Sequence, residues 1–160
     1  MTLDIPPHAV AAEGLQRQFQ AVRAQSLALA APLSAEDQCI QSMPDASPTK
    51  WHLAHTTWFF ETLLLQPHLP GYQPFDARFQ FLFNSYYESL GPRHPRVQRG
   101  LLSRPSLADV HAYRQHVDVA VLALLQAADA PLAAQIAPIV TLGLQHEQQH
   151  QELITTDILH

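Results

Sequence analysis

Apolar residues recur every three to four positions in four long segments of the chain, which is the spacing of one face of an α-helix. The segments cover residues 10–30, 48–65, 106–128 and the part of the chain that follows Pro131. The third segment shows the pattern most plainly, with apolar positions at Val110, Tyr113, Val117, Val121 and Leu124. No stretch alternates apolar and polar residues as a half-buried strand would. The sequence therefore predicts an all-α fold.

Polar residues with helix-capping chemistry precede three of the helical stretches. Ser47 followed by Pro48 predicts an N-cap and a first helical residue for the second long helix, and Pro67 and Pro70-Gly71 are expected to stop that helix. Ser34 with Asp37, and Ser106 with Asp109, have the spacing of capping boxes for a short helical turn and for the third long helix. The fourth helix is expected to start after Pro131 and to restart at Pro138.

The segment between the second and third long helices has no clear period. It contains many aromatic residues, and we expect a short helix near residues 76–89 followed by a long ordered loop. Four long helices joined by one long crossover are typical of an up-down four-helix bundle. A length of 160 residues suits a single domain, so we expect residues 1–160 to form one helical domain.

Composition narrows the functional classes. Hydrophobic residues make up 47% of the chain and charged residues 14%, and the net charge of -5 disfavours nucleic acid as a partner. Cys39 is the only cysteine, which excludes a disulfide framework and a cysteine-rich zinc site. The N-terminal residues do not resemble a signal peptide, and no apolar run reaches the ~18 residues of a membrane span, so we expect a cytoplasmic protein.

The ten histidines are more than a chain of this size needs for packing, and two of them form the clearest chemical motif. His146 and His150 are four residues apart in the fourth helix, so both face the same side and can bind one metal ion. They share the expected inward stripe with other residues of that helix, namely Ile139, Gly143, Leu153 and Asp157.

A third imidazole comes from the second helix. His55 lies on a largely aromatic face, where each ring nitrogen needs a partner. A metal ion would supply one partner; a backbone carbonyl or the Thr62 hydroxyl would supply it if His55 is a purely structural histidine. Three histidines from two helices would leave open positions for water, substrate or dioxygen. His52 is the second choice for this ligand because it lies nearer the edge of the stripe. The remaining histidines are expected in solvent: His8, His68, His94, His111, His116 and His160.

The stretch His146-Glu147-Gln148-Gln149-His150 also matches H-E-x-x-H, the motif of zinc peptidases. The extended form of that motif would place a glycine at position 153 and a histidine at position 156, where this chain has Leu153 and Thr156. No later helix is expected to supply an acidic ligand, and no strand is expected to bind a peptide. A zinc metallopeptidase is therefore the less favoured alternative.

Four blocks of sequence carry a family resemblance. They are SPTKWHLAHTTWFFE at residues 47–61, FNSYY at 83–87, RGLLSRP at 99–105 and GLQHEQQHQEL at 143–153. In this order they resemble the N-terminal DinB-like domain of the sulfoxide synthases of ergothioneine biosynthesis. The resemblance covers nearly everything from residue 10 onward, and it implies a DinB-like four-helix bundle.

The resemblance also implies a reaction and a set of site residues. It implies that His55, His146 and His150 bind a non-haem Fe(II), and that dioxygen is used to join the thiol of γ-glutamylcysteine or cysteine to the imidazole of hercynine as a sulfoxide. Gln149 is expected to hydrogen-bond hercynine. Arg96 and Arg99 are expected to pair with carboxylates of the thiol substrate, a role that suits guanidinium groups.

One departure from the family leaves other functions open. Family members carry a second domain, related to formylglycine-generating enzymes, that closes over the iron. These 160 residues do not include it, so the chain is expected to be either a fragment of such a synthase or a stand-alone relative. A stand-alone DinB-like thiol S-transferase using Zn(II) or Ni(II) is the main alternative, because imidazole ligands suit these metals too. A metal-free helical module that binds a partner through its aromatic loop is the third. A bundle without the covering domain is also expected to form a homodimer through exposed apolar surface.

Overall fold

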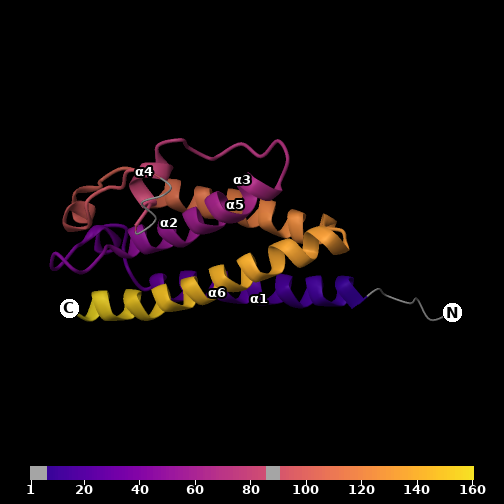
Figure 1. The fold of residues 1–160 in the computed structure, drawn as a ribbon. Coiled ribbons are helices and arrows are strands. Elements are labelled where there is room, and N and C mark those ends of the chain that lie inside the picture. Colours follow the sequence, from indigo (N-terminus) through magenta and orange to yellow (C-terminus); the bar gives the residue numbers. More distant parts are fainter. Residues whose placement is uncertain (1–6, 86–90) are drawn as a thin grey trace.

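Four long helices lie side by side in an elongated bundle in the computed structural model, which describes residues 7–85 and 91–160 (Figure 1). They are α1 (Pro7–Ala30), α2 (Thr49–Phe60), α5 (Leu107–Ala127) and α6 (Ala130–Leu159). A short 3-10 helix, η1 (Asp37–Cys39), lies between α1 and α2. The all-α four-helix bundle expected from the sequence is confirmed.

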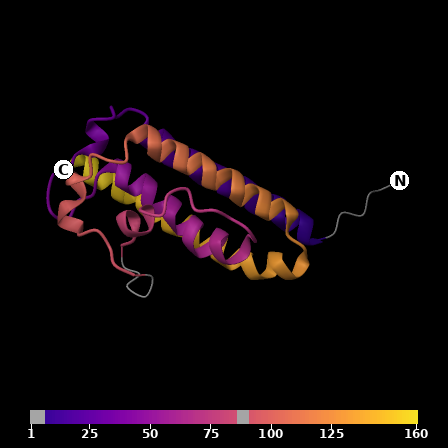
Figure 2. The same cartoon turned by 90° about the horizontal axis from the view of Figure 1, so that it is seen from above.

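The order of helix directions explains the long crossover. α1 and α6 run in one direction along the bundle, whereas α2 and α5 both run in the other (Figure 2). The chain therefore does not alternate strictly up and down, because it must return along the bundle between α2 and α5. This return contains α4 (Phe79–Phe83) and the 3-10 helix η4 (Arg96–Leu101). The short helix predicted near residues 76–89 is thus only five residues long, and residues 86–89 of that prediction lie outside the described chain.

Two of the predicted caps form, and one does not. Ser106 and Asp109 make a complete capping box at the start of α5, and Ser34 and Asp37 exchange the same pair of bonds before η1. Ser47 does not cap the second helix, since Pro48 occupies the cap position and no side chain bonds the helix end. A long-range contact outcompetes the local cap, because the Ser47 hydroxyl instead accepts a hydrogen bond from Arg99.

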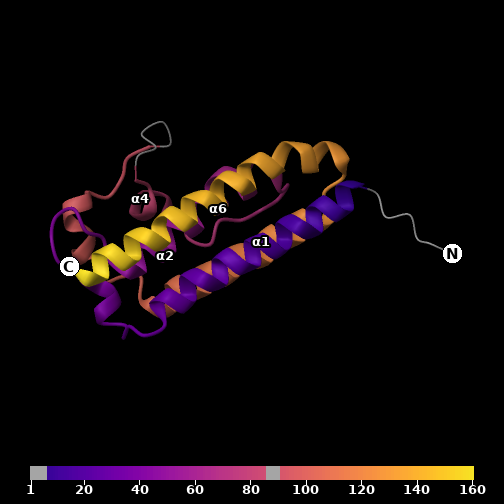
Figure 3. The ribbon, with the colours of Figure 1, turned by 90° about the horizontal axis from the view of Figure 1, so that it is seen from below.

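The helix stop predicted at Pro67 and the helix start predicted after Pro131 are wrong, whereas the helix does end at His68, before Pro70-Gly71. α2 continues into a π-helix, η2 (Glu61–Leu65), and then α3 (Gln66–His68), so the helix passes through Pro67. Pro67 lies in the first turn of α3, a position where a helix tolerates proline. α6 begins before Pro131, with Asp129 as its N-cap. The N–H groups of a first helical turn have no partner within the helix, so a proline, which has no N–H, is tolerated there. Figure 3 shows α6 as one continuous helix that bends in its first half, so it does not restart at Pro138.

α2 is the central helix, since all twelve of its residues are buried. It packs against α1, α5, α6 and α4, so a side chain on any of its faces meets protein. The predicted face of α5 is buried as expected, from Val110 to Leu124. No helix in the described part of the chain is both long and apolar enough to cross a membrane.

Candidate metal centre

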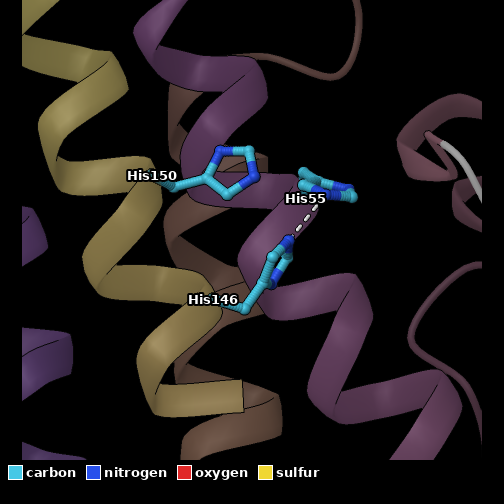
Figure 4. Close-up of side chains that lie close together, drawn as sticks. All are labelled: His55, His146 and His150. Atoms are coloured by element: carbon cyan, nitrogen blue, oxygen red, sulfur yellow. Dashed lines mark hydrogen bonds between the residues drawn. The ribbon is translucent and has the colours of Figure 1, made fainter. Parts of the chain in front are cut away.

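Three histidines from the two central crossing helices form a triangle in the interior. His55 comes from α2, and His146 and His150 come from successive turns of α6 (Figure 4). The ring centroids are 4.9 Å apart for His55 and His146, 4.8 Å for His55 and His150, and 4.6 Å for His146 and His150. One nitrogen of each ring lies within 4.8 Å of the other two, so the three side chains could hold one metal ion.

His55 is fixed in both orientation and tautomer. Its ring is stacked between Trp51 and Trp58, with an interplanar angle of 13° to each. Its Nδ1 lies 2.6 Å from the carbonyl oxygen of Phe83. A carbonyl can only accept, so Nδ1 carries the hydrogen and Nε2 is left with a lone pair. That lone pair points to His146, where the two Nε2 atoms are 3.1 Å apart.

The spacing of these two nitrogens fits a metal ion. Two imidazole nitrogens at ~2.1 Å from one metal, and at a right angle, are about 3.0 Å apart. Burial lowers the pKa of His146 to about 4, and burial together with the His146 charge holds the pKa of His55 well below its usual value. Both rings are therefore neutral at pH 7, as metal ligands must be. The Nδ1 of His146 is buried without a hydrogen-bond partner among the described residues.

His150 is held by two further side chains. Its Nδ1 lies 2.8 Å from the Nδ1 of His52, and the Nε2 of His52 lies 2.9 Å from a carboxylate oxygen of Asp157. The sequence placed His52 at the edge of the inward stripe, but the structure buries it, with 2% of its surface exposed. Burial lowers the pKa of both His52 and His150, and the nearby rings lower that of His150 further.

A cavity of about 440 Å³ opens beside the three histidines. All six residues that the sequence singles out for metal or substrate line it: His55, His146, His150, Gln149, Arg96 and Arg99. The described lining residues include two arginines and no carboxylate, so the cavity carries positive charge. The described histidines that were expected in solvent do not line it. The cavity is therefore suited to an anionic ligand next to a metal ion.

Arg99 is built into the wall of this cavity. Its guanidinium lies 3.3 Å from the ring centroid of Trp51, the same indole that stacks on His55. It donates to the hydroxyl groups of Ser47 at 2.9 Å and of Ser85 at 3.0 Å. Arg96 is more exposed and donates to the Asp45 carbonyl. One cation is thus fixed deep in the cavity and a second stands at its rim.

Glu147 points away from the cavity, into a charged cluster that the sequence reasoning missed. Its carboxylate accepts from Arg23 and Arg114 at 2.9 Å each, and from the Ser26 hydroxyl at 2.6 Å. Burial alone would raise the pKa of Glu147, but the two arginines outweigh it and lower the pKa to about 2. A carboxylate held in this way cannot act as the general base of a peptidase. The sequence did contain a signal for this cluster: Arg23, Arg114 and Glu147 each lie among the apolar positions of their own helix.

Comparison with known proteins places most of this chain in one family model. The model of the DinB superfamily matches residues 18–154, a span that includes all three histidines of the triangle. No curated protein matches the chain.

Proposed function

Because the chain belongs to the DinB superfamily, we propose that it is a metal-dependent enzyme domain whose metal is held by His55, His146 and His150. One observation carries this proposal. The Nε2 atoms of His55 and His146 face each other at 3.1 Å, and His55 has its only ring hydrogen on Nδ1. Such a pair of buried, neutral nitrogens, with a third imidazole beside it, is a donor set for a divalent transition metal.

The proposed reaction is the iron(II)- and dioxygen-dependent joining of a cysteine-type thiol to hercynine. A carbon–sulfur bond forms at the imidazole carbon as its C–H bond and the S–H bond of the thiol are lost, and the sulfur is oxidised to a sulfoxide. Dioxygen is the oxidant: one of its oxygen atoms enters the sulfoxide, and the other leaves as water with the two hydrogens. Support comes from the four blocks that resemble sulfoxide synthases, because each of them contributes a residue to the wall of the same cavity, the one beside the three histidines. Trp51, Ser85, Arg99 and His146 represent the four blocks there.

The charges of the cavity suit these substrates. Cysteine and γ-glutamylcysteine are anionic at their carboxylates, and Arg99 and Arg96 would bind these groups through charge-assisted hydrogen bonds. Gln149 lies on the exposed side of α6 at the cavity, where its amide could hydrogen-bond the hercynine ring. A bound Fe(II) would supply redox chemistry with dioxygen and a positive charge that favours thiolate over thiol.

A thiol S-transferase using Zn(II) or Ni(II) is the second candidate. The observation in its favour is the donor set itself, since three neutral imidazoles suit these metals as well as iron. A cationic cavity would also accept a small anionic thiol without hercynine. The two candidates differ in their use of dioxygen.

The first test is anaerobic titration with Fe(II) of the wild type and of His55→Ala and His146→Ala. We expect stoichiometric binding by the wild type and a large loss of affinity in both variants. His111→Ala, which removes an exposed histidine of α5, is the matched control and should bind like the wild type. Undiminished binding by either of the first two variants would exclude this site.

The second test separates the two reactions. Oxygen uptake is measured with the iron-loaded protein, hercynine, and either cysteine or γ-glutamylcysteine. Uptake that requires both substrates supports the sulfoxide synthase. Thiol transfer without oxygen uptake supports the transferase and contradicts the synthase.

A further inference from the structure

His150 differs from the other two histidines in what holds its second nitrogen. The Nδ1 of His55 bonds to a backbone carbonyl, whereas the Nδ1 of His150 bonds to the side chain of His52. His52 in turn bonds to Asp157, which lies two turns beyond His150 on the same helix. The contacts form a closed path from α6 to α2 and back to α6.

The direction of each hydrogen bond in this path follows from Asp157. The carboxylate oxygen that faces His52 can only accept, and it also accepts the backbone N–H of Ser47 at 2.8 Å. The Nε2 of His52 therefore carries the hydrogen, which leaves the Nδ1 of the neutral ring as an acceptor. His150 must then donate from its own Nδ1, and its Nε2 keeps a lone pair.

We propose that Asp157 and His52 form a positioning relay that fixes the tautomer and the ring plane of His150 so that its Nε2 can bind the metal. The relay rests on the proposed metal site, but neither residue is one of its three ligands. Partners of this kind typically change metal affinity by ~10–100-fold when they are removed. Because the relay joins α2 to α6, it also ties the orientation of His150 to the helix that carries His55.

Two variants break the relay from different sides. His52→Leu removes the acceptor for His150 and leaves the bond between Ser47 and Asp157 in place. Asp157→Leu leaves His52 in place but no longer fixes its tautomer. Asp157→Asn can still present an amide oxygen to the Ser47 N–H and to the Nε2–H of His52. It is therefore the conservative variant, and it is expected to keep the tautomer of His150. Glu152→Leu removes an exposed acidic residue of the same helix and is the control.

The first readout does not depend on metal. Nitrogen–proton correlation spectra of the histidine side chains, recorded on the metal-free protein at neutral pH, report which nitrogen of His150 carries the hydrogen. We expect the Nδ1–H form in the wild type, Asp157→Asn and Glu152→Leu, and a mixture or the Nε2–H form in His52→Leu and Asp157→Leu. A wild-type spectrum with hydrogen on Nε2 of His150 would overturn the relay.

The second readout is metal affinity, measured by competition with a chelator of known affinity. We expect His52→Leu and Asp157→Leu to bind Fe(II) ~10–100-fold more weakly than the wild type, and Asp157→Asn to recover most of that loss. The double variant, His52→Leu with Asp157→Leu, should bind metal no more weakly than His52→Leu alone. Asp157 acts through His52, so the two losses of affinity should not add. Wild-type affinity in both leucine variants, verified as folded by circular dichroism, would overturn the relay.

The two readouts separate this inference from the proposed function. A wild-type protein that binds no metal would contradict the metal site, while the His150 tautomer would still decide whether the relay exists. A wild-type protein that binds metal, with variants that bind equally well, would contradict the relay alone.

Discussion

Replacing Glu147 by glutamine should destabilise the fold strongly. The carboxylate is 1% exposed and accepts ion-pair hydrogen bonds from Arg23 and Arg114. Arg23 also pairs with Asp118, but Arg114 otherwise donates to neutral oxygens, including the carbonyl of Leu53. The substitution therefore leaves a buried guanidinium without its hydrogen-bonded carboxylate.

The size of the effect follows from that uncompensated charge. Removing one partner of a buried ion pair typically costs about 3–5 kcal/mol, because the remaining charge stays out of water. The amide NH₂ of glutamine adds to the cost, since it would face an arginine N–H. For a chain of this length, the loss corresponds to a fall in Tm of roughly 6–20 °C.

The measurement is urea unfolding followed by far-UV circular dichroism, with chelator present so that bound metal does not contribute to stability. Glu152→Gln is the matched control, because the same change is made on an exposed position of the same helix, and it should stay within about 0.5 kcal/mol of the wild type. A zinc peptidase predicts the opposite result, in which Glu147→Gln is as stable as the wild type and loses only hydrolytic activity. Equal stability of Glu147→Gln and the wild type would refute the reasoning.

Three further predictions concern packing, capping and metal binding. Gly143→Ala should destabilise the fold by about 1–3 kcal/mol, because its Cβ would lie 2.5 Å from a buried ring atom of Phe60. Gly14→Ala should stabilise the fold by about 0.5–1 kcal/mol, because a Cβ added there would meet no atom within 4 Å. Ser106→Ala should cost about 1 kcal/mol through loss of its cap. Urea unfolding checks these substitutions. An unchanged free energy of unfolding in Gly143→Ala or in Ser106→Ala would contradict the corresponding prediction. Fe(II) at 100 times its Kd should stabilise the wild type by about 2.7 kcal/mol and should not stabilise His55→Ala.

The features that the sequence predicted well are those that depend on neighbouring residues. The four helices follow from the spacing of apolar residues, and the capping box of Ser106 is formed within one turn. His146 and His150 could be paired because one helix sets their separation. His55 was identified by its place on an aromatic face, and the structure shows the aromatic pair, Trp51 and Trp58, that encloses it.

The features that the sequence did not predict depend on which helices meet. The hydroxyl of Ser47 bonds to Arg99, which lies 52 positions later, and this contact replaces the expected cap. The contact of His52 with His150 joins residues 98 positions apart. Glu147 is 124 positions from Arg23. Hydrophobic periodicity states which face of a helix is buried, but not which helix covers that face, so such pairs appear only once the bundle is assembled.

The H-E-x-x-H stretch of α6 serves two different surfaces, so it matches a peptidase motif in sequence but not in the role of its acidic residue. Successive side chains of a helix are turned by about 100°, so Glu147 faces α1 and α5 while His146 faces α2. The ion pairs of Glu147 hold α6 against Arg23 of α1 and Arg114 of α5. Gly143, one turn earlier, allows α6 to approach the aromatic rings of α2 closely. The acidic residue therefore sets the position of the helix that presents the two histidines, and its contribution to the centre is structural.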